Sequence, residues 1–421
     1  MGKEPELARR LGTPDAVIIG LGSMIGAGVF AAFTPAAAAA GSGLLLGLVI
    51  AAGVAFCNAT SSAQLAAAYP RSGGTYLYGR ERLGPWPGYL AGWGFVVGKT
   101  ASAAAMAMTF AAYTAPDGLE RPVAVAAVVA LAAVNSHGIT RTAGLARILV
   151  GLVLAALVVA LAAAWIGAGP TAAVGPGLDG GLLGRGWYGI LQSAGLLFFA
   201  FAGYARIATM SEEVLRPRRT IPRAIGISLA IAVAVYAAVG VTLLTVLGPE
   251  GVAATAAPLA AAVEAGSGSW AAPVVRAGAA VAALGALLAL IAGLGRTTLA
   301  MARERDLPHW LSAVHPRYQV PHRAEAVLAV LICTVIAVAD LRGAIAFSSF
   351  GVLVYYLVAN IAALTQSGAD RRYPQAFQVL GAAACIVLVA TLPPRAVVLG
   401  VLVFAVGIIG RMIRLRFSGS S

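Results

Sequence analysis

Long runs of apolar residues recur along the whole chain, and they decide what it can fold into. Residues 43–68, for example, contain no charged side chain. About 20 consecutive apolar residues are enough for a helix to cross the hydrocarbon core of a bilayer. Strands of a membrane β-barrel instead alternate apolar and polar residues over about ten positions, which these continuous runs do not do. The chain is therefore expected to be an all-α polytopic membrane protein.

The composition leaves little of the chain for anything else. Of the 421 residues, 60% are hydrophobic and only 11% are charged, and the mean hydropathy is +0.88. Soluble domains have about 25% charged residues, so a soluble enzyme is excluded. We expect residues 1–421 to form a single membrane domain with 12 transmembrane helices. The expected spans are 14–40, 43–68, 85–115, 121–136, 143–168, 187–210, 222–248, 271–301, 324–340, 344–366, 375–392 and 395–413.

The basic residues predict how the chain is oriented. The net charge is +13, yet a nucleic-acid surface would gather its basic residues on one face or helix, whereas these are spread over short loops. With the N-terminus inside, 22 of the 29 Lys and Arg residues fall in cytoplasmic segments. This asymmetry predicts that both termini are cytoplasmic, and no nucleic-acid partner is expected. Basic residues before 14–40 resemble a signal peptide, but that apolar run is too long, so we expect a retained first helix.

Signatures of cofactors, metals and catalysis do not occur in the sequence. Cys57, Cys333 and Cys385 lie in apolar runs, which is typical of small core residues and not of a disulfide framework. No cysteine accompanies the histidines that follow the eighth span, and no Ser/His/Asp arrangement or phosphate-binding loop occurs. We therefore expect no cofactor, no metal site and no enzymatic activity.

Two of the expected spans are interrupted by small residues. The first contains the glycine-rich stretch 20–28, and the sixth contains the stretch 198–204. Five spans separate the two interruptions, which is the arrangement that an inverted repeat produces. The repeats would be 14–168 and 187–366, with 375–413 outside them and without recognisable chemistry of its own.

A break in a membrane helix frees backbone groups, and these need a partner because an unpaired group in the bilayer costs several kcal/mol. Amides that begin a half-helix near Gly22 to Gly28 can face a negative group, and carbonyls that end the preceding half-helix suit an ammonium. An α-amino acid carries both groups a few ångströms apart. One alternative is that the glycines only let helices pack closely. A dinucleotide-binding loop is a second alternative, but it needs a preceding strand.

Four motifs together resemble a known family. They are Gly22-Ser-Met-Ile-Gly-Ala-Gly-Val-Phe30, Pro70-Arg-Ser-Gly-Gly-Thr-Tyr76, Phe198-Phe-Ala-Phe-Ala-Gly-Tyr204 and Arg303-Glu-Arg-Asp-Leu-Pro308. In this order they make spans one to ten similar to the amino acid, polyamine and organocation transporter family, and to bacterial amino acid permeases within it. The resemblance implies a five-plus-five inverted repeat (the LeuT-like fold), with broken helices 1 and 6 and alternating access.

The same resemblance implies a substrate site at the two breaks. The substrate carboxylate would meet the backbone amides of Ala27 and Gly28, and Phe201 would close the pocket. The carbonyls of Met24, Phe199 and Ala202 would accept from the substrate ammonium, with Ile25, Gly26 and Gly203 completing the two breaks. Many family members have a hydroxyl residue where Ala27 stands, so carboxylate binding here would rely on the backbone.

Lys99 is the charge that topology does not explain. It lies more than ten residues from either end of the third span, so its ammonium cannot easily reach the membrane surface. Burial favours loss of the proton from an amine, and we expect Lys99 to couple transport to protons. The alternative is a structural amine that caps carbonyls of a broken helix. Sodium coupling is disfavoured because Ala283 to Gly295 contains no side-chain oxygen from Ser, Thr, Asn, Asp or Glu.

The cytoplasmic end of the sixth span offers candidate gate residues. These are Tyr204, Arg206 and Glu212, for which a solvated ion-pair network is the alternative interpretation.

Taken together, the sequence predicts secondary active, proton-coupled uptake of neutral α-amino acids across the bacterial cytoplasmic membrane. Its partners would be the amino acid, protons and membrane lipid, with no obligatory protein partner. An amino acid exchanger is the alternative, and a non-transporting sensor or a channel is less favoured because paired mid-membrane breaks are typical of transporters.

Overall fold

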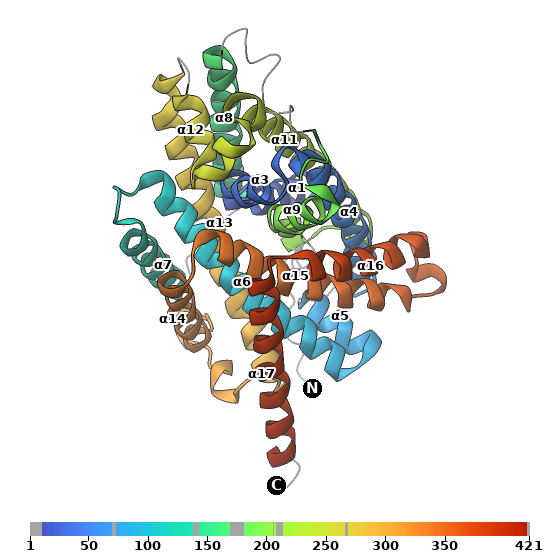
Figure 1. The fold of residues 1–421 in the computed structure, drawn as a ribbon. Coiled ribbons are helices and arrows are strands. Elements are labelled where there is room, and N and C mark those ends of the chain that lie inside the picture. Colours follow the sequence, from blue (N-terminus) through green and yellow to red (C-terminus); the bar gives the residue numbers. More distant parts are fainter. Residues whose placement is uncertain are drawn as a thin grey trace.

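The computed structural model describes residues 11–69, 73–137, 143–168, 181–204, 206–207, 214–265 and 268–418 (Figure 1). Within these ranges the regular secondary structure is helical, and the one strand-like pairing is an isolated bridge between Leu11 and Val214. The prediction of an all-α protein is therefore confirmed for the described part of the chain.

The long helices follow the order of the predicted spans. In chain order they are α1 (Thr13–Met24), α2 (Ala27–Ala31), α3 (Phe33–Ala40), α4 (Leu44–Ala68), α5 (Gly74–Leu83), α6 (Pro85–Thr114), α7 (Glu120–Ser136), α8 (Ala143–Ala168), α9 (Gly186–Phe201), α11 (Pro217–Ala254), α12 (Pro258–Glu264), α13 (Ala272–Arg303), α14 (His322–Val338), α15 (Leu341–Leu364), α16 (Gln375–Thr391) and α17 (Pro394–Ser418). Short 3₁₀ turns are η1 (Gly41–Gly43), η4 (Ala202–Tyr204), η5 (Ser269–Ala271), η6 (His309–Ser312) and η7 (Gly368–Asp370).

Nine helical segments of the described chain are long and apolar enough to cross a membrane. The other three predicted spans coincide with α7, α14 and α16, each of 17 residues. Seventeen residues lie at the short end of the range for a membrane helix. A polytopic membrane protein is thus confirmed, and the count of twelve crossings stays a prediction.

Both predicted interruptions occur as breaks in helical structure. α1 ends at Met24 and α2 begins at Ala27, because Gly26 adopts a non-helical conformation with φ −108° and ψ −139°. The sixth span changes from α-helix to 3₁₀ turn at Ala202. The stretch predicted as one span over 14–40 is three helices, since α3 begins separately at Phe33 and continues through η1 into α4.

The helix α6 runs through the middle of the bundle, packed against α13 on one side and α15 on the other (Figure 1). Its contact with α15 is backbone to backbone. A Cβ on Gly351 would lie 2.7 Å from the carbonyl oxygen of Gly94 and 2.8 Å from the Cα of Gly98. Small residues at membrane helix interfaces allow this approach, and here it fixes the position of the next residue along, Lys99.

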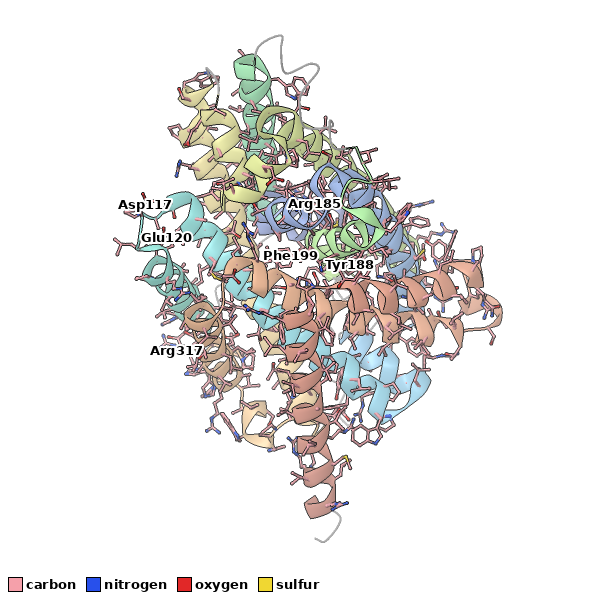
Figure 2. The ribbon with its side chains drawn as sticks, viewed as in Figure 1. Asp117, Glu120, Arg185, Tyr188, Phe199 and Arg317 are labelled. Atoms are coloured by element: carbon pink, nitrogen blue, oxygen red, sulfur yellow. The ribbon has the colours of Figure 1, made fainter. Side chains whose placement is uncertain are left out.

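The helix α9 leads from the surface to the centre of the bundle. Tyr188 near its start is exposed and Phe199 near its end is buried. Figure 2 labels both residues, together with Asp117 and Glu120 at the edge of the molecule. The break in the sixth span therefore lies in the protein interior. There the backbone amides and carbonyls that the break frees can contact other helices, and they do not face lipid.

Candidate functional site

The two helix breaks lie directly against each other. A Cβ on Gly203 would lie 2.2 Å from the carbonyl oxygen of Ser23 and 2.6 Å from the amide nitrogen of Met24. One turn further on, a Cβ on Gly28 would lie 2.6 Å from the Cα of Ala200. Because the neighbouring atoms are backbone, only glycine allows these contacts. The glycines of the two motifs therefore bring the broken segments of the first and sixth spans together.

A tyrosine that the sequence did not single out bridges the two breaks. The hydroxyl of Tyr236, on α11, lies 2.7 Å from the carbonyl oxygen of Met24 and 3.0 Å from that of Ala200. Its ring packs edge to face on Phe201 with centroids 4.9 Å apart. The only sequence signal for Tyr236 is that it is the single aromatic residue within the mainly apolar stretch 222–248. In this structure the Met24 carbonyl, expected to bind a substrate ammonium, is paired with Tyr236.

Lys99 reaches the other break. Its side chain is buried, with 8% of its surface exposed, and its Nζ donates to the carbonyl oxygen of Ala202 at 3.4 Å. The hydroxyl of Tyr356, on α15, donates to the same oxygen at 3.4 Å. The structure thus places Lys99 beside a carbonyl oxygen that, by the family resemblance, was expected to bind the substrate ammonium.

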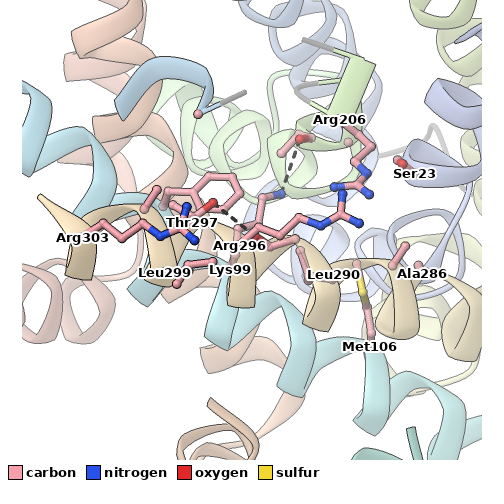
Figure 3. A pocket seen from close by; sticks show the side chains of 17 residues that line it. Ser23, Lys99, Met106, Arg206, Ala286, Leu290, Arg296, Thr297, Leu299 and Arg303 are labelled. Carbon is pink, nitrogen blue, oxygen red and sulfur yellow. Dashed lines mark hydrogen bonds between the residues drawn. The ribbon is translucent and has the colours of Figure 1, made fainter. Parts of the chain in front are cut away.

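A cavity of about 400 Å³ opens beside this carbonyl (Figure 3). Of the predicted site residues, Lys99, Ala202, Gly203 and Arg206 line it. Arg296 and Arg303, which also line it, are exposed, so the cavity opens at the end of the bundle where α13 finishes. A smaller cavity of about 100 Å³, lined by Ile25, shares Arg206 with it. A passage therefore leads from one end of the bundle to the sixth-span break.

Several predicted site residues do not line the larger cavity. They are Met24, Ile25, Gly26, Ala27, Gly28, Phe199, Phe201 and Tyr204. The backbone of Gly28 is covered by Ala200, and Ala27 is fully buried. The ring of Tyr204 stacks at a tilt on Tyr356 with centroids 5.1 Å apart. Glu212 falls outside the described residues. The roles given to these residues from the sequence stay predictions.

At the end of the bundle opposite the cavity mouth, the short helix α12 packs over the ends of α2 and α6. The hydroxyl of Tyr113, on α6, donates to the carbonyl oxygen of Phe30 at 3.0 Å and accepts from the amide of Leu259, on α12, at 3.4 Å. Arg276 pairs with Glu264 at the end of α12 at 2.9 Å. The short helix α12 therefore covers the side away from the cavity mouth.

The amino acid permease family matches residues 11–414. The chain belongs to this family. It is 59% identical to an uncharacterized transporter of Mycobacterium tuberculosis, over 96% of this chain and 90% of that protein. It is 25% identical to a branched-chain amino acid permease of Bacillus subtilis, over 90% and 85% of the two chains. A chloroplastic cationic amino acid transporter of Arabidopsis thaliana is 27% identical, over 84% and 65%.

At the cavity end, this permease has a buried polar group that we call the Asp306 cluster, formed by Tyr76, Arg80, Asp306 and Arg411. One oxygen of Asp306 accepts from the Tyr76 hydroxyl at 2.7 Å and from Arg80 at 2.8 Å. The other lies 2.8 Å from the guanidinium of Arg411. Burial, together with the neighbouring Asp306 carboxylate, raises the pKa of Tyr76 well above its usual value. The cluster joins α5 and the loop after α13 to α17.

The segment 375–413, for which the sequence shows no recognisable chemistry of its own, contributes Arg411 to this buried ion pair. Its guanidinium is centred 4.6 Å from the rings of Trp86 and Tyr89, and it donates to the carbonyl oxygen of Pro85 at 2.8 Å. Only 5% of its side chain is exposed. By its place in the sequence Arg411 looks like an arginine that flanks a membrane span, and only the folded chain shows that it is buried.

Replacing Tyr236 with phenylalanine is expected to weaken the permease without unfolding it. The ring contact with Phe201 would remain, but two buried carbonyl oxygens would lose their shared donor, which costs about 1–3 kcal/mol. We expect a lower thermal midpoint in detergent and a changed KM for transport. A Tyr188→Phe variant, in which an exposed phenol is altered, is the control and should match the parent protein. Equal midpoints for the two variants would contradict the bridging role.

Proposed function

We propose that this permease carries out secondary active transport of α-amino acids by alternating access. The observation that carries the proposal is the cavity that leads from the exposed end of α13 to Ala202 and Gly203, while α12 covers the other end. A site that is open to one side and closed to the other is what alternating access requires of each of its end states. Family membership supports an amino acid as the substrate.

The chain is further proposed to be a five-plus-five inverted repeat of 14–168 and 187–366, with the helices of 375–413 added. The positions of the two breaks, five spans apart and in mutual contact, support this arrangement. With both termini in the cytoplasm of a bacterial cell, the cavity mouth faces inward. The structure would then correspond to the state that releases substrate.

In the proposed site the substrate ammonium binds carbonyls of the two breaks and its carboxylate binds amides at the start of α2. The carbonyls of Met24 and Ala202 already accept from Tyr236 and Lys99, so a substrate must displace these donors. Binding would therefore be linked to movement of α6 and α11 side chains at the breaks. Non-cationic substrates are expected, since Lys99 repels a cationic side chain, and neutral amino acids are the class predicted from the sequence.

Proton coupling is proposed to run through Lys99. In proteoliposomes, a Lys99→Ala variant is expected to lose amino acid accumulation driven by a pH gradient, by about tenfold or more, because the group that exchanges the proton is gone. Counterflow of substrate in the absence of a gradient should persist. A Lys99→Arg variant, which keeps a charge that does not dissociate, should also lose accumulation. Full pH-driven accumulation by Lys99→Ala would refute this role. Uptake that depends on a sodium gradient would instead indicate sodium coupling in place of proton coupling.

The substrate class is tested by measuring the thermal stability of the purified permease against each of the twenty amino acids. A ligand that binds only the folded state raises the midpoint by mass action. A shift with no amino acid would contradict the proposed function. Uptake into proteoliposomes then separates net transport from exchange, because an exchanger requires amino acid on both sides of the membrane.

A further inference from the structure

A buried carboxyl group lies behind the wall of the cavity. Glu325 is in the first turn of α14, and 3% of its surface is exposed. Its Oε1 accepts from the side-chain amide of Asn135, on α7, at 2.7 Å. Its Oε2 is buried and has no hydrogen-bond partner among the described residues. An ionised carboxylate that is out of water and only half satisfied is costly, so this side chain suits a group that gains and loses a proton.

The carboxyl group of Glu325 packs directly on α13, the helix that forms one side of the cavity. A Cβ on Gly295 would lie 2.9 Å from the Cγ of Glu325 and 3.2 Å from its Oε1. The next residue, Arg296, lines the cavity, and its positive charge acts on the Glu325 carboxyl group. Arg296 is nevertheless not a hydrogen-bond partner of this group in the described chain. Figure 3 shows that its side chain extends into the cavity, toward Arg206.

The other titratable groups around Glu325 have different surroundings. His322, one helical turn earlier on α14, packs its ring on that of His315 with centroids 5.4 Å apart. The remaining ones that α14 and its neighbours α13, α7, η6 and α6 carry at the cavity end are exposed or bonded to other groups, namely Arg323, Arg303, His137, His309, Tyr89 and Lys99. Arg296 is thus the described charge that acts on Glu325.

The two protonation states of Glu325 have different effects on Arg296. A guanidinium stays charged, so a carboxylate attracts it and a neutral carboxylic acid does not. We propose that Glu325 binds a proton at the cavity mouth and thereby positions Arg296. When Oε2 takes a proton from water at the mouth, Arg296 extends into the cavity. When that proton returns to water, Arg296 turns back to Glu325 and the passage clears. This inference rests on the proposed function for its purpose, and it adds a proton site distinct from Lys99.

An Ala289→Cys variant tests the position of Arg296 without any substrate. Ala289 lines the cavity about two helical turns before Arg296 on α13. The rate at which a trimethylammonium thiosulfonate labels the new thiol is divided by the rate for a neutral thiosulfonate of similar size, which cancels the effect of pH on the thiol. We expect this labelling ratio to rise about fivefold or more from mildly acidic to mildly alkaline pH, because Arg296 then leaves the cavity. The protein without Ala289→Cys gives the background from its native cysteines.

Further changes in the Ala289→Cys protein show which group binds the proton. Glu325→Gln keeps an acceptor for Asn135 but cannot ionise, so the labelling ratio should stay low and change by about twofold or less. Arg296→Gln should give a high ratio at both ends of the pH range. Glu304→Gln, which alters an exposed glutamate at the same end of the bundle, should keep the parental pH dependence. A rise that survives Glu325→Gln, or one that His322→Gln abolishes instead, would overturn the proposal.

Infrared spectra of the purified protein detect the proton itself, because a protonated carboxylic acid has a C=O stretching band that a carboxylate and an amide lack. The difference spectrum between acidic and alkaline pH should lose such a band in Glu325→Gln and keep it in His322→Gln. If Glu325→Gln is too unstable to purify, Arg296→Gln decides, since a parental pH dependence of labelling in that variant would overturn the proposal. Neither measurement needs transport, so their failure leaves the proposed function standing. Binding of no amino acid would overturn the proposed function and leave the proton site of Glu325.

Discussion

A permease with Gly203 replaced by alanine is expected to be almost inactive in transport. The added methyl group would lie 2.2 Å from the carbonyl oxygen of Ser23 and 2.3 Å from its carbonyl carbon. Real Cβ atoms do not approach backbone this closely, so the breaks of the first and sixth spans must separate. Overpacking of this kind costs about 3 kcal/mol or more, which corresponds to a loss of about 100-fold if it falls on the transport step.

The measurement is initial uptake into proteoliposomes, normalised to the amount of folded protein. Gly53→Ala is the matched control, since Gly53 is also a helical glycine and a Cβ there meets no atom within 4 Å. We expect Gly53→Ala to retain uptake within about twofold and to keep the parental thermal midpoint. Retention of half or more of the parental uptake by Gly203→Ala would show that close contact of the breaks is not required.

Replacing Asp306 with asparagine is expected to be the most destabilising conservative change at the cavity end. The side chains of Asp306 and Arg411 are 4% and 5% exposed, so the change leaves a buried guanidinium without its carboxylate. Removing one partner of a buried ion pair costs about 3–5 kcal/mol. We expect the thermal midpoint in detergent to fall by about 5 °C or more.

Two further variants show whether the loss of stability in Asp306→Asn comes from breaking the ion pair between Asp306 and Arg411. Glu304→Gln removes the other carboxylate that contacts Arg80, but its side chain is 54% exposed, so the effect should stay below about 1 kcal/mol. Combining Asp306→Asn with Arg411→Met should destabilise less than the sum of the single changes, because the second change removes the unpaired charge. Additive effects would mean that the Asp306–Arg411 contact contributes no pairing energy.

The breaks could be predicted from the sequence because their causes are local. Glycines around Gly26 and Gly203 interrupt apolar runs, and an interrupted backbone in a membrane needs partners inside the protein. Lys99 could be predicted to be buried for a similar reason, since its distance from the span ends prevents it from reaching the surface. These inferences need only neighbouring residues and the thickness of a bilayer.

The partners of these groups could not be predicted, because they come from distant parts of the chain. Tyr236 lies more than 200 residues beyond Met24 and looks like one aromatic residue in an apolar helix. Arg411 looks like the other arginines that flank membrane spans, and only packing against Trp86 shows otherwise. A single sequence gives the position of each residue along its own helix, but not which side chains of other helices surround it.

The Asp306 cluster has a consequence for how the protein is made. Chains enter the membrane from the N-terminus, so Arg80 and Asp306 are already in place when Arg411, more than 100 residues later, emerges from the ribosome. Until then the buried carboxylate has Arg80 as its guanidinium partner from this cluster, and the loop after α13 is held less firmly. The second guanidinium partner of Asp306 therefore arrives only when α17 inserts, so we expect the cavity end of the bundle to become fixed later than the contact between the two helix breaks.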